Sequence, residues 1–172
     1  MSRTIIINII RFIVLVFVQV FLLKNITLYN LAIPYLYILF ILLLPFEIPN
    51  ILLFALAFIM GLTIDAFYDT AGLHAAACTM LAFVRIIFIS LTVQKEGFDN
   101  DPEPTLSIMG FRWFFTYATV LTLFHHFFLF NLEVFRFSEI QYTFSRFILS
   151  SVFTVFLMLV TGLLFFRRKE RK

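Results

Sequence analysis

Residues 25–46 have the sequence NITLYNLAIPYLYILFILLLPF and contain no charged side chain. The next uncharged run, at 48–64, is IPNILLFALAFIMGLTI, and another at 147–166 is FILSSVFTVFLMLVTGLLFF. Such runs are close to the roughly 20 apolar residues that an α-helix needs to cross the hydrocarbon of a bilayer. Strands of a membrane β-barrel alternate apolar and polar residues, whereas these runs are apolar at both alternating positions. We therefore expect helices.

The composition excludes a soluble chain. Of 172 residues, 62% are hydrophobic, 13% are charged and 26 are phenylalanines, whereas soluble domains are roughly half apolar and about a quarter charged. The single cysteine, Cys78, cannot form an internal disulfide and lies among alanines, where we interpret it as a small packing residue. These features exclude a soluble enzyme, a disordered tail, a secreted disulfide scaffold and a collagen-like chain.

We therefore predict an all-α, polytopic membrane protein that forms a single integral membrane domain over residues 1–172. The second of its spans is the least regular, because Pro34 lies in the first turn. A chain of five spans, with residues 29–45 re-entrant, is the alternative. The six predicted transmembrane helices cover about 5–23, 29–45, 49–68, 72–93, 110–130 and 142–166.

The distribution of basic residues predicts the orientation. Six spans place both termini on one side, and cytoplasmic sides carry more Arg and Lys. No Ala or Gly occurs before Ala32, so the first span lacks the small-residue cleavage site of a signal peptide, and we expect it to remain as a helix. Both termini are therefore predicted to be cytoplasmic. The predicted cytoplasmic side holds Arg3, Arg11, Lys95, Arg112 and the basic tail 167–172, and the opposite side holds Lys24, Arg136 and Arg146.

The long polar loop at 95–108 is predicted to be cytoplasmic. It is acidic, with Lys95 against Glu96, Asp99, Asp101 and Glu103. The spacing and terminal Glu of an EF-hand are missing, so the loop is not a predicted calcium site. We interpret it as a solvated linker, with a docking contact for a cytosolic partner as the alternative.

Several ionisable residues lie within predicted spans, where such groups need a partner or a function. Counting helix rise places Asp65, His74, His125, His126 and Arg146 in one layer near the outer surface. Equal depth and opposite charge lead us to expect an Asp65–Arg146 ion pair.

Two arginines lie deeper than that layer, on the cytoplasmic half. Arg11 is roughly two turns into the first span and can extend to the headgroups. Arg85 lies near mid-membrane, and we expect backbone carbonyls or a neighbouring helix to bind it as a buried structural residue; a transport residue is the alternative.

The sequence contains no recognisable catalytic or metal-binding motif. His125 and His126 are adjacent and point about 100° apart on a helix, which does not suit a shared metal. A nucleophile elbow and a phosphate-binding loop are also missing. We predict a protein that is not an enzyme, with no catalytic, cofactor-binding or metal-binding residues.

Small residues predict where helices pack tightly. In lipid, such residues let two helices approach closely. Ala57 and Gly61 are four residues apart on the third span. On the fourth span, the small residues are Ala71, Ala75, Cys78, Thr79 and Ala82. We expect these two spans to form a tight hairpin.

The same hairpin resembles a known family. Residues 61–75, GLTIDAFYDTAGLHA, are similar to the signature of the bacterial rod shape-determining membrane protein MreD, in which Gly-Leu-x-x-Asp and a short turn precede Gly-Leu-His-Ala. Many members carry a proline before the second Gly-Leu; here Ala71 stands near that place. The matching residues are Gly61, Leu62, Asp65, Gly72, Leu73, His74 and Ala75.

The resemblance implies a non-catalytic component of the bacterial cytoplasmic (inner) membrane that acts in cell shape and directed peptidoglycan synthesis. Its expected partner is MreC, and through it MreB filaments, RodA and a penicillin-binding transpeptidase. The implied fold is similar to the substrate-binding subunits of energy-coupling-factor transporters. The candidates for structural or partner-contact roles are Gly61, Asp65, Gly72, His74, Arg85 and Arg146.

The alternative function is a small-molecule-binding subunit of an energy-coupling-factor-type vitamin transporter. Those subunits typically carry an Ala-x-x-x-Ala docking stripe on the first helix. Residues 5–23 contain neither Ala nor Gly, which argues against this function.

Overall fold

The computed structural model describes residues 2–26, 32–93, 103–133 and 140–165. Within these ranges the chain is helical and has no β-strand. Five helices in the described part are long and apolar enough to cross a membrane, which indicates a multi-pass membrane protein. They are α1 (Ser2–Phe17) with its π-helical continuation η1 (Val18–Leu23), α3 (Asn50–Tyr68), α4 (Leu73–Thr92), α6 (Phe111–Glu133) and α7 (Ile140–Phe165).

The predicted spanning helix over 29–45 is wrong for the described residues of that stretch, 32–45, which we call the central segment. Residues 32–35 are not helical, and only the 3₁₀ turn η2 (Leu36–Ile38) and the single turn α2 (Leu39–Leu42) follow. Pro34 lacks the N–H of a helix and disfavours the helical conformation of the residue before it. Residues 36–44 are 0–7% exposed. The segment is apolar on every side because protein surrounds it.

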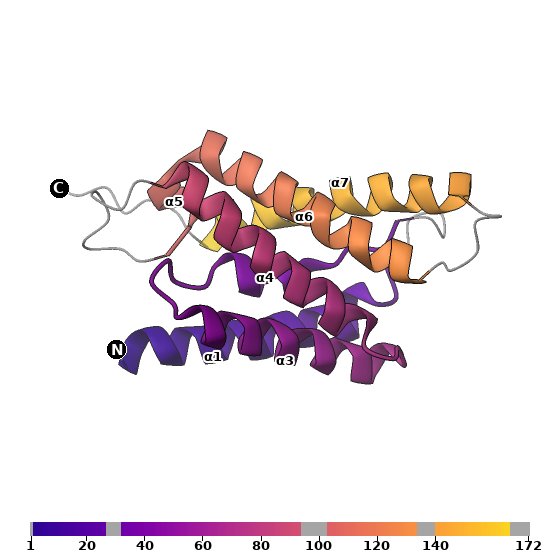
Figure 1. Cartoon of the computed structure of the whole chain (residues 1–172), viewed down its shortest axis with the longest axis horizontal. Coiled ribbons are helices and arrows are strands. Elements are labelled where there is room, and N and C mark those ends of the chain that lie inside the picture. Colours follow the sequence, from indigo (N-terminus) through magenta and orange to yellow (C-terminus); the bar gives the residue numbers. More distant parts are fainter. Residues whose placement is uncertain (1, 27–31, 94–102, 134–139, 166–172) are drawn as a thin grey trace.

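The central segment carries the chain back along the bundle. Helices α1 and α3 run in the same direction (Figure 1), so the chain between them must return. The path therefore differs from a lipid-facing sixth helix and from a re-entrant loop that leaves on the side it entered. We call the left end of Figure 1, where α1 begins and α7 ends, the terminal end, and the right end, with the α3–α4 turn, the hairpin end. Both described chain ends lie at the terminal end, as the predicted topology requires.

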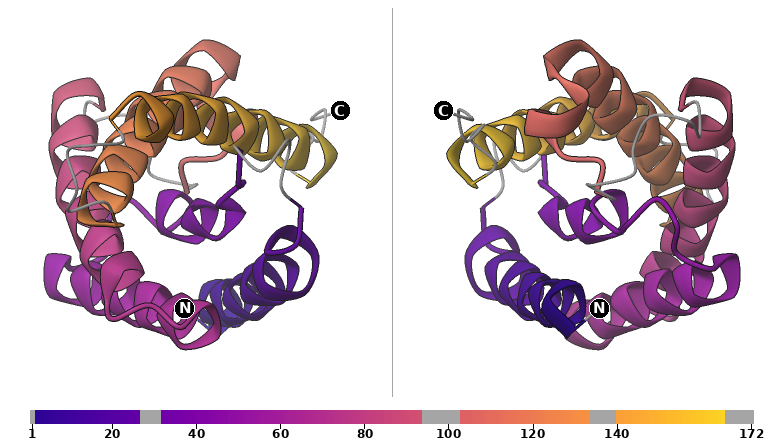
Figure 2. Two further views of the ribbon diagram at one scale, coloured as in Figure 1. Left: turned by 90° about the vertical axis from the view of Figure 1, so that its right-hand side faces the viewer. Right: turned by 90° about the vertical axis from the view of Figure 1, so that its left-hand side faces the viewer.

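Seen end on, the five long helices form a ring in the order α1, α3, α4, α6 and α7 (Figure 2). The central segment lies inside this ring, and the short helix α5 (Leu106–Met109) lies at the terminal end. The side chains of the central segment, together with Leu53, Met60, Leu81 and Leu121, form the apolar core. The interior of the ring is thus filled by the chain itself.

The tight α3–α4 hairpin expected from the small residues is confirmed. A Cβ atom at Gly61 would overlap the carbonyl oxygen of His74 and the backbone of Ala75. Only glycine allows this approach of one helix to the start of the next. The turn itself uses two left-handed residues, Asp69 at φ 54° and Gly72 at φ 85°.

Candidate functional site

Asp65 sits where α3 ends and caps the start of α4. Its Oδ1 accepts the backbone N–H of His74 at 3.0 Å, and its Oδ2 accepts that of Ala75 at 2.9 Å. The hydroxyl of Thr70 also donates to Oδ1. The first N–H groups of a helix lack helical partners and carry partial positive charge, so a carboxylate there is favourable. A buried charge is thereby satisfied within the hairpin.

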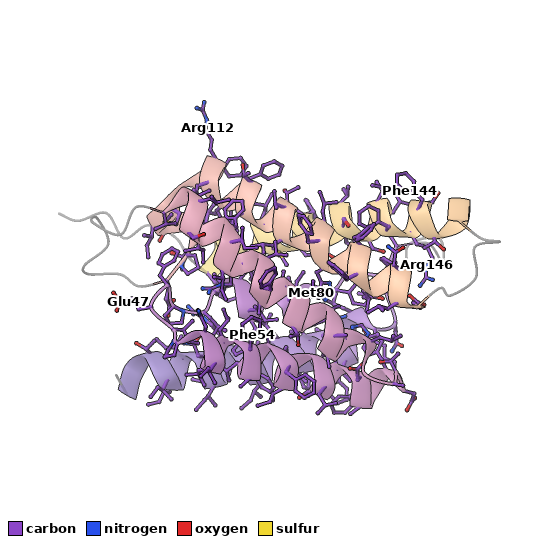
Figure 3. The ribbon with its side chains drawn as sticks, viewed as in Figure 1. Glu47, Phe54, Met80, Arg112, Phe144 and Arg146 are labelled. Atoms are coloured by element: carbon purple, nitrogen blue, oxygen red, sulfur yellow. The ribbon has the colours of Figure 1, made fainter. Side chains whose placement is uncertain are left out.

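The expected Asp65–Arg146 ion pair is therefore wrong. The guanidinium of Arg146 lies 3.3 Å from Oε1 of Glu133 and 5.1 Å from the centre of the Phe130 ring. Figure 3 places Arg146 at the hairpin end, as predicted from its depth. Depth alone does not say which way a side chain faces on its helix, and nearby backbone N–H groups already bind the carboxylate of Asp65.

The predicted histidine layer is joined by a residue that the sequence reading did not include. The hydroxyl of Tyr37, in the central segment, lies 2.8 Å from Nδ1 of His74 and 3.0 Å from Nε2 of His125. All three side chains are buried, and Sγ of Cys78 lies 4.0 Å from the same His125 nitrogen. The hydroxyl of Tyr37 therefore links the central segment to two helices of the ring, α4 and α6.

His126 continues this hydrogen-bonded chain toward α7. Its Nδ1 lies 2.9 Å from the carbonyl oxygen of Thr122, which can only accept, so this nitrogen donates. Its Nε2 is then an acceptor for the hydroxyl of Thr154 at 3.3 Å, and the oxygen of Thr154 accepts the backbone N–H of Tyr35 at 3.0 Å. With a neutral imidazole at His126, each of these donors and acceptors has a partner.

Other polar side chains bind the non-helical backbone at the start of the central segment. Gln19 is fully buried; its amide donates to the carbonyl oxygen of Pro34 at 3.0 Å and to the hydroxyl of Tyr68 at 2.9 Å. The hydroxyl of Ser150 accepts the N–H of Ile33 at 3.0 Å. Non-helical backbone is tolerated at membrane depth only where protein supplies such partners.

Arg85 holds the other end of the central segment. It is 2% exposed, and one guanidinium nitrogen donates to the carbonyl oxygens of Leu44 and, at 3.2 Å, Pro45. Its Nε donates to the hydroxyl of Tyr117 at 3.1 Å, and that hydroxyl donates to the carbonyl oxygen of Leu42 at 2.9 Å. The expected role of Arg85, a buried arginine bound by carbonyls and a neighbouring helix, is confirmed. A cation suits the carbonyl end of a helical turn.

The acidic loop lies partly outside the described residues, since 94–102 are not among them. Its described end is not a solvated linker: Thr105 and Leu106 are buried, and Leu106 begins α5. Glu103 forms an ion pair with Arg11 of α1 at 2.8 Å. Arg11 therefore has a carboxylate partner that its position in the sequence did not reveal.

Arg112 lies at its expected end of the bundle. Figure 3 shows it at the terminal end, as it does Glu47, and Arg112 points away from the bundle. Residues 167–172, the predicted basic tail, lie outside the described residues. Among the described residues, no group of three His, Cys, Asp or Glu side chains is placed to hold a metal ion.

The residues missed by sequence reasoning share a signal that was available. Gln19 interrupts an otherwise apolar run, and Ser150 and Thr154 are spaced four apart on one face of the last span. Such polar residues in a membrane helix hydrogen-bond across to a neighbour. They could have indicated that the interior contains backbone in need of partners.

The geometry defines a helical multi-pass membrane protein whose buried polar residues hold the central segment inside a ring of helices. Compared with protein-family models, curated proteins and solved structures, the chain matches none of them.

Proposed function

We propose that this chain is a non-catalytic membrane scaffold of the bacterial elongation (rod) machinery, of the MreD type, that binds MreC beside its helices. Through MreC it would contribute to cell shape and directed peptidoglycan synthesis with MreB filaments, RodA and a penicillin-binding transpeptidase. The proposal includes six passes, with the central segment as the broken one, a fold similar to energy-coupling-factor substrate-binding subunits, and cytoplasmic termini in the inner membrane.

The observation that carries this proposal is that the matching residues of 61–75 contact one another in the structure. Gly61 allows the contact with the backbone at His74 and Ala75, and Asp65 binds the two N–H groups at the same place. Gly72 supplies the left-handed residue immediately before α4. Residues that resemble a signature by chance need not act together, whereas Gly61, Asp65, His74 and Ala75 form one contact. This supports the resemblance to the MreD family.

The buried polar residues have structural partners within the chain, which further supports a scaffold. Asp65, His74 and Arg85 are each bound to the protein's own backbone or to the central segment. The outer surface of the long helices is apolar and includes the exposed side chains Ile9, Ile13, Phe58, Phe127 and Phe156. Such a surface suits lipid and the transmembrane helix of a partner.

The vitamin-transporter alternative has less support. A ligand would need the interior of the ring near the hairpin end, where Tyr37, Ile38 and His125 are fully buried against one another and their neighbours. Screening vitamins by thermal shift in detergent tests this alternative: a saturable increase in melting temperature with one vitamin would favour it.

The test of the proposed function combines cell shape and partner capture. Depleting the protein from a rod-shaped bacterium that encodes it should produce round cells, and tagged protein extracted from membranes should retain MreC. As a control, re-expression of the unaltered protein should restore rod shape. Rod-shaped cells after depletion, together with a stable tagged protein that captures no MreC, would contradict the proposal.

A further inference from the structure

The two parts of the first membrane helix, α1 and η1, differ in how far their side chains are buried. In its α-helical part, no side chain between Thr4 and Val14 is buried, and Leu15 is the first buried residue. In the π-helical turn η1, by contrast, Gln19 and Leu23 are buried, and Gln19 binds Pro34 and Tyr68. The hairpin-end part of this span is anchored, and the terminal-end part lies on the surface of the ring.

In the described structure, the side chains of Phe12, Leu15 and Val16 pack the terminal-end part against the apolar core. The ring of Phe12 packs edge-on against that of Phe40 in the central segment, with centroids 5.4 Å apart. Arg11 donates to Glu103 at 2.8 Å, and the two side chains are 16% and 17% exposed. Apolar contact with lipid replaces apolar contact with protein at little difference in free energy. The Arg11–Glu103 ion pair is therefore a specific attachment of this part, in addition to its apolar packing.

Glu103 connects α1 to α7, the helix next to it in the ring. Three residues after it, Leu106 packs into the bundle, where its side chain lies next to Gly162 of α7. The short stretch from Glu103 to Leu106 thus joins α1 to α7 at the terminal end. Breaking the ion pair would release α1 from this connection without disturbing the apolar contact at α7.

The point at which the two parts of the span meet has hinge geometry. Residues 18–23 form a π-helical turn, in which the backbone N–H of Lys24 bonds the carbonyl oxygen of Gln19 at 2.8 Å. π-Helical turns are uncommon, occur frequently at functional sites, and are recognised points of helix bending. Here the turn lies immediately after the last turn of α1, in which Leu15 is buried while Val14 and Phe17 are exposed.

We propose that residues 2–17 are a movable arm that pivots at η1, and that the Arg11–Glu103 ion pair is the latch that keeps it against the bundle. When the latch opens, the arm moves away from Phe40 at the terminal end while Gln19 keeps the hairpin end in place. This is a conformational device of the fold and does not depend on the identity of any partner.

Distance measurements between spin labels in lipid nanodiscs test the arm. One pair of labels is attached to Ile9→Cys and Leu163→Cys, at the terminal ends of α1 and α7, and a second pair to Phe21→Cys and Phe144→Cys, near the hairpin end. All four positions are exposed, and Cys78, which is fully buried, stays in place. Glu103→Gln should increase the long-distance population of the first pair about fivefold, the upper range for a partly exposed ion pair. The second pair should be unchanged.

Two variants separate the latch from a general loosening. Glu133→Gln breaks the Arg146–Glu133 ion pair at the other end and should leave the first pair of labels unchanged. Exchanging the charges, with Arg11→Glu and Glu103→Arg together, should restore the short distance. The proposal is overturned if Glu103→Gln leaves the first distance distribution unchanged, or if both label pairs respond equally.

Discussion

The α3–α4 hairpin and α1 are both apolar enough to cross a membrane, yet the bundle holds them very differently. The α1 span has the highest mean hydropathy of the five, but only 11% of it is buried, against 33% for α3 and for α4. The hairpin contains Gly61 and the carboxylate of Asp65, whereas the described α1 residues that face lipid are mostly isoleucines. Hydropathy therefore indicates that a helix enters lipid, and small or polar residues decide how tightly it packs there.

Of the substitutions that test this difference, Gly61→Ala has the largest expected effect. The new methyl group would overlap the backbone of α4, which cannot move aside as a flexible side chain can, so the free energy of unfolding should fall by about 3 kcal/mol. Unfolding in bicelles measures the change. Gly162→Ala is the matched control, because a Cβ there meets side-chain atoms of Leu106 and Phe114 at 3.4–3.7 Å. Equal losses for the two variants would contradict the tight hairpin.

The next test removes the charge that caps α4. Asp65→Asn should lower the free energy of unfolding by about 2 kcal/mol, because the amide nitrogen cannot accept the backbone N–H that a carboxylate oxygen accepts. Exchanging Asp65 and Arg146 should not restore stability, since the two side chains do not form a pair. Rescue by the exchange would instead favour the ion pair expected from depth.

Tyr37→Phe extends the comparison to the central segment. The variant keeps the ring but leaves His74 Nδ1 and His125 Nε2 without the hydroxyl between them. We expect a loss of about 1 kcal/mol in the same unfolding measurement, because a buried polar group without a partner is unfavourable. Wild-type stability would show that the two histidines do not depend on this hydroxyl.

The smallest effect is expected on α1. Ile13 is 60% exposed, and Ile13→Leu changes one lipid-facing aliphatic side chain for another. The free energy of unfolding should change by less than about 0.5 kcal/mol, since lipid tails are as apolar as the side chain. A loss above about 1 kcal/mol would mean that this face of α1 packs against protein.

Composition and charge-free runs predicted the helical membrane fold, because both can be read from each helix alone, without knowing how the helices pack. The positions of α3, α4, α6 and α7 followed from the same signal, whereas the close approach at Gly61 followed from the small residues on the third and fourth spans. The described part of the predicted span over 29–45, residues 32–45, was assigned incorrectly because a stretch surrounded by lipid and one surrounded by protein are equally apolar. Pro34 was the local evidence for a break, but proline is also tolerated in the first turn of a helix.

The site was harder to predict because its partners come from segments distant in sequence. The depths of His74 and His125 were useful, since both do lie in one layer. What joins them is Tyr37, from the segment that was assigned to a separate helix. Asp65 was given a partner by charge and depth alone, whereas its real partners are backbone N–H groups, which no side-chain pattern reveals.

The position of the central segment also sets an order of events during biosynthesis. Residues 32–45 leave the ribosome early, but the hydroxyls that bind the N–H groups of Ile33 and Tyr35 belong to Ser150 and Thr154 of the last helix. Because chains emerge amino-terminal end first, this part of the polypeptide must wait in the translocon or in lipid until translation is nearly finished. A chain truncated before α7 would therefore be left with its early backbone unpaired, which is a clear mark for membrane quality control.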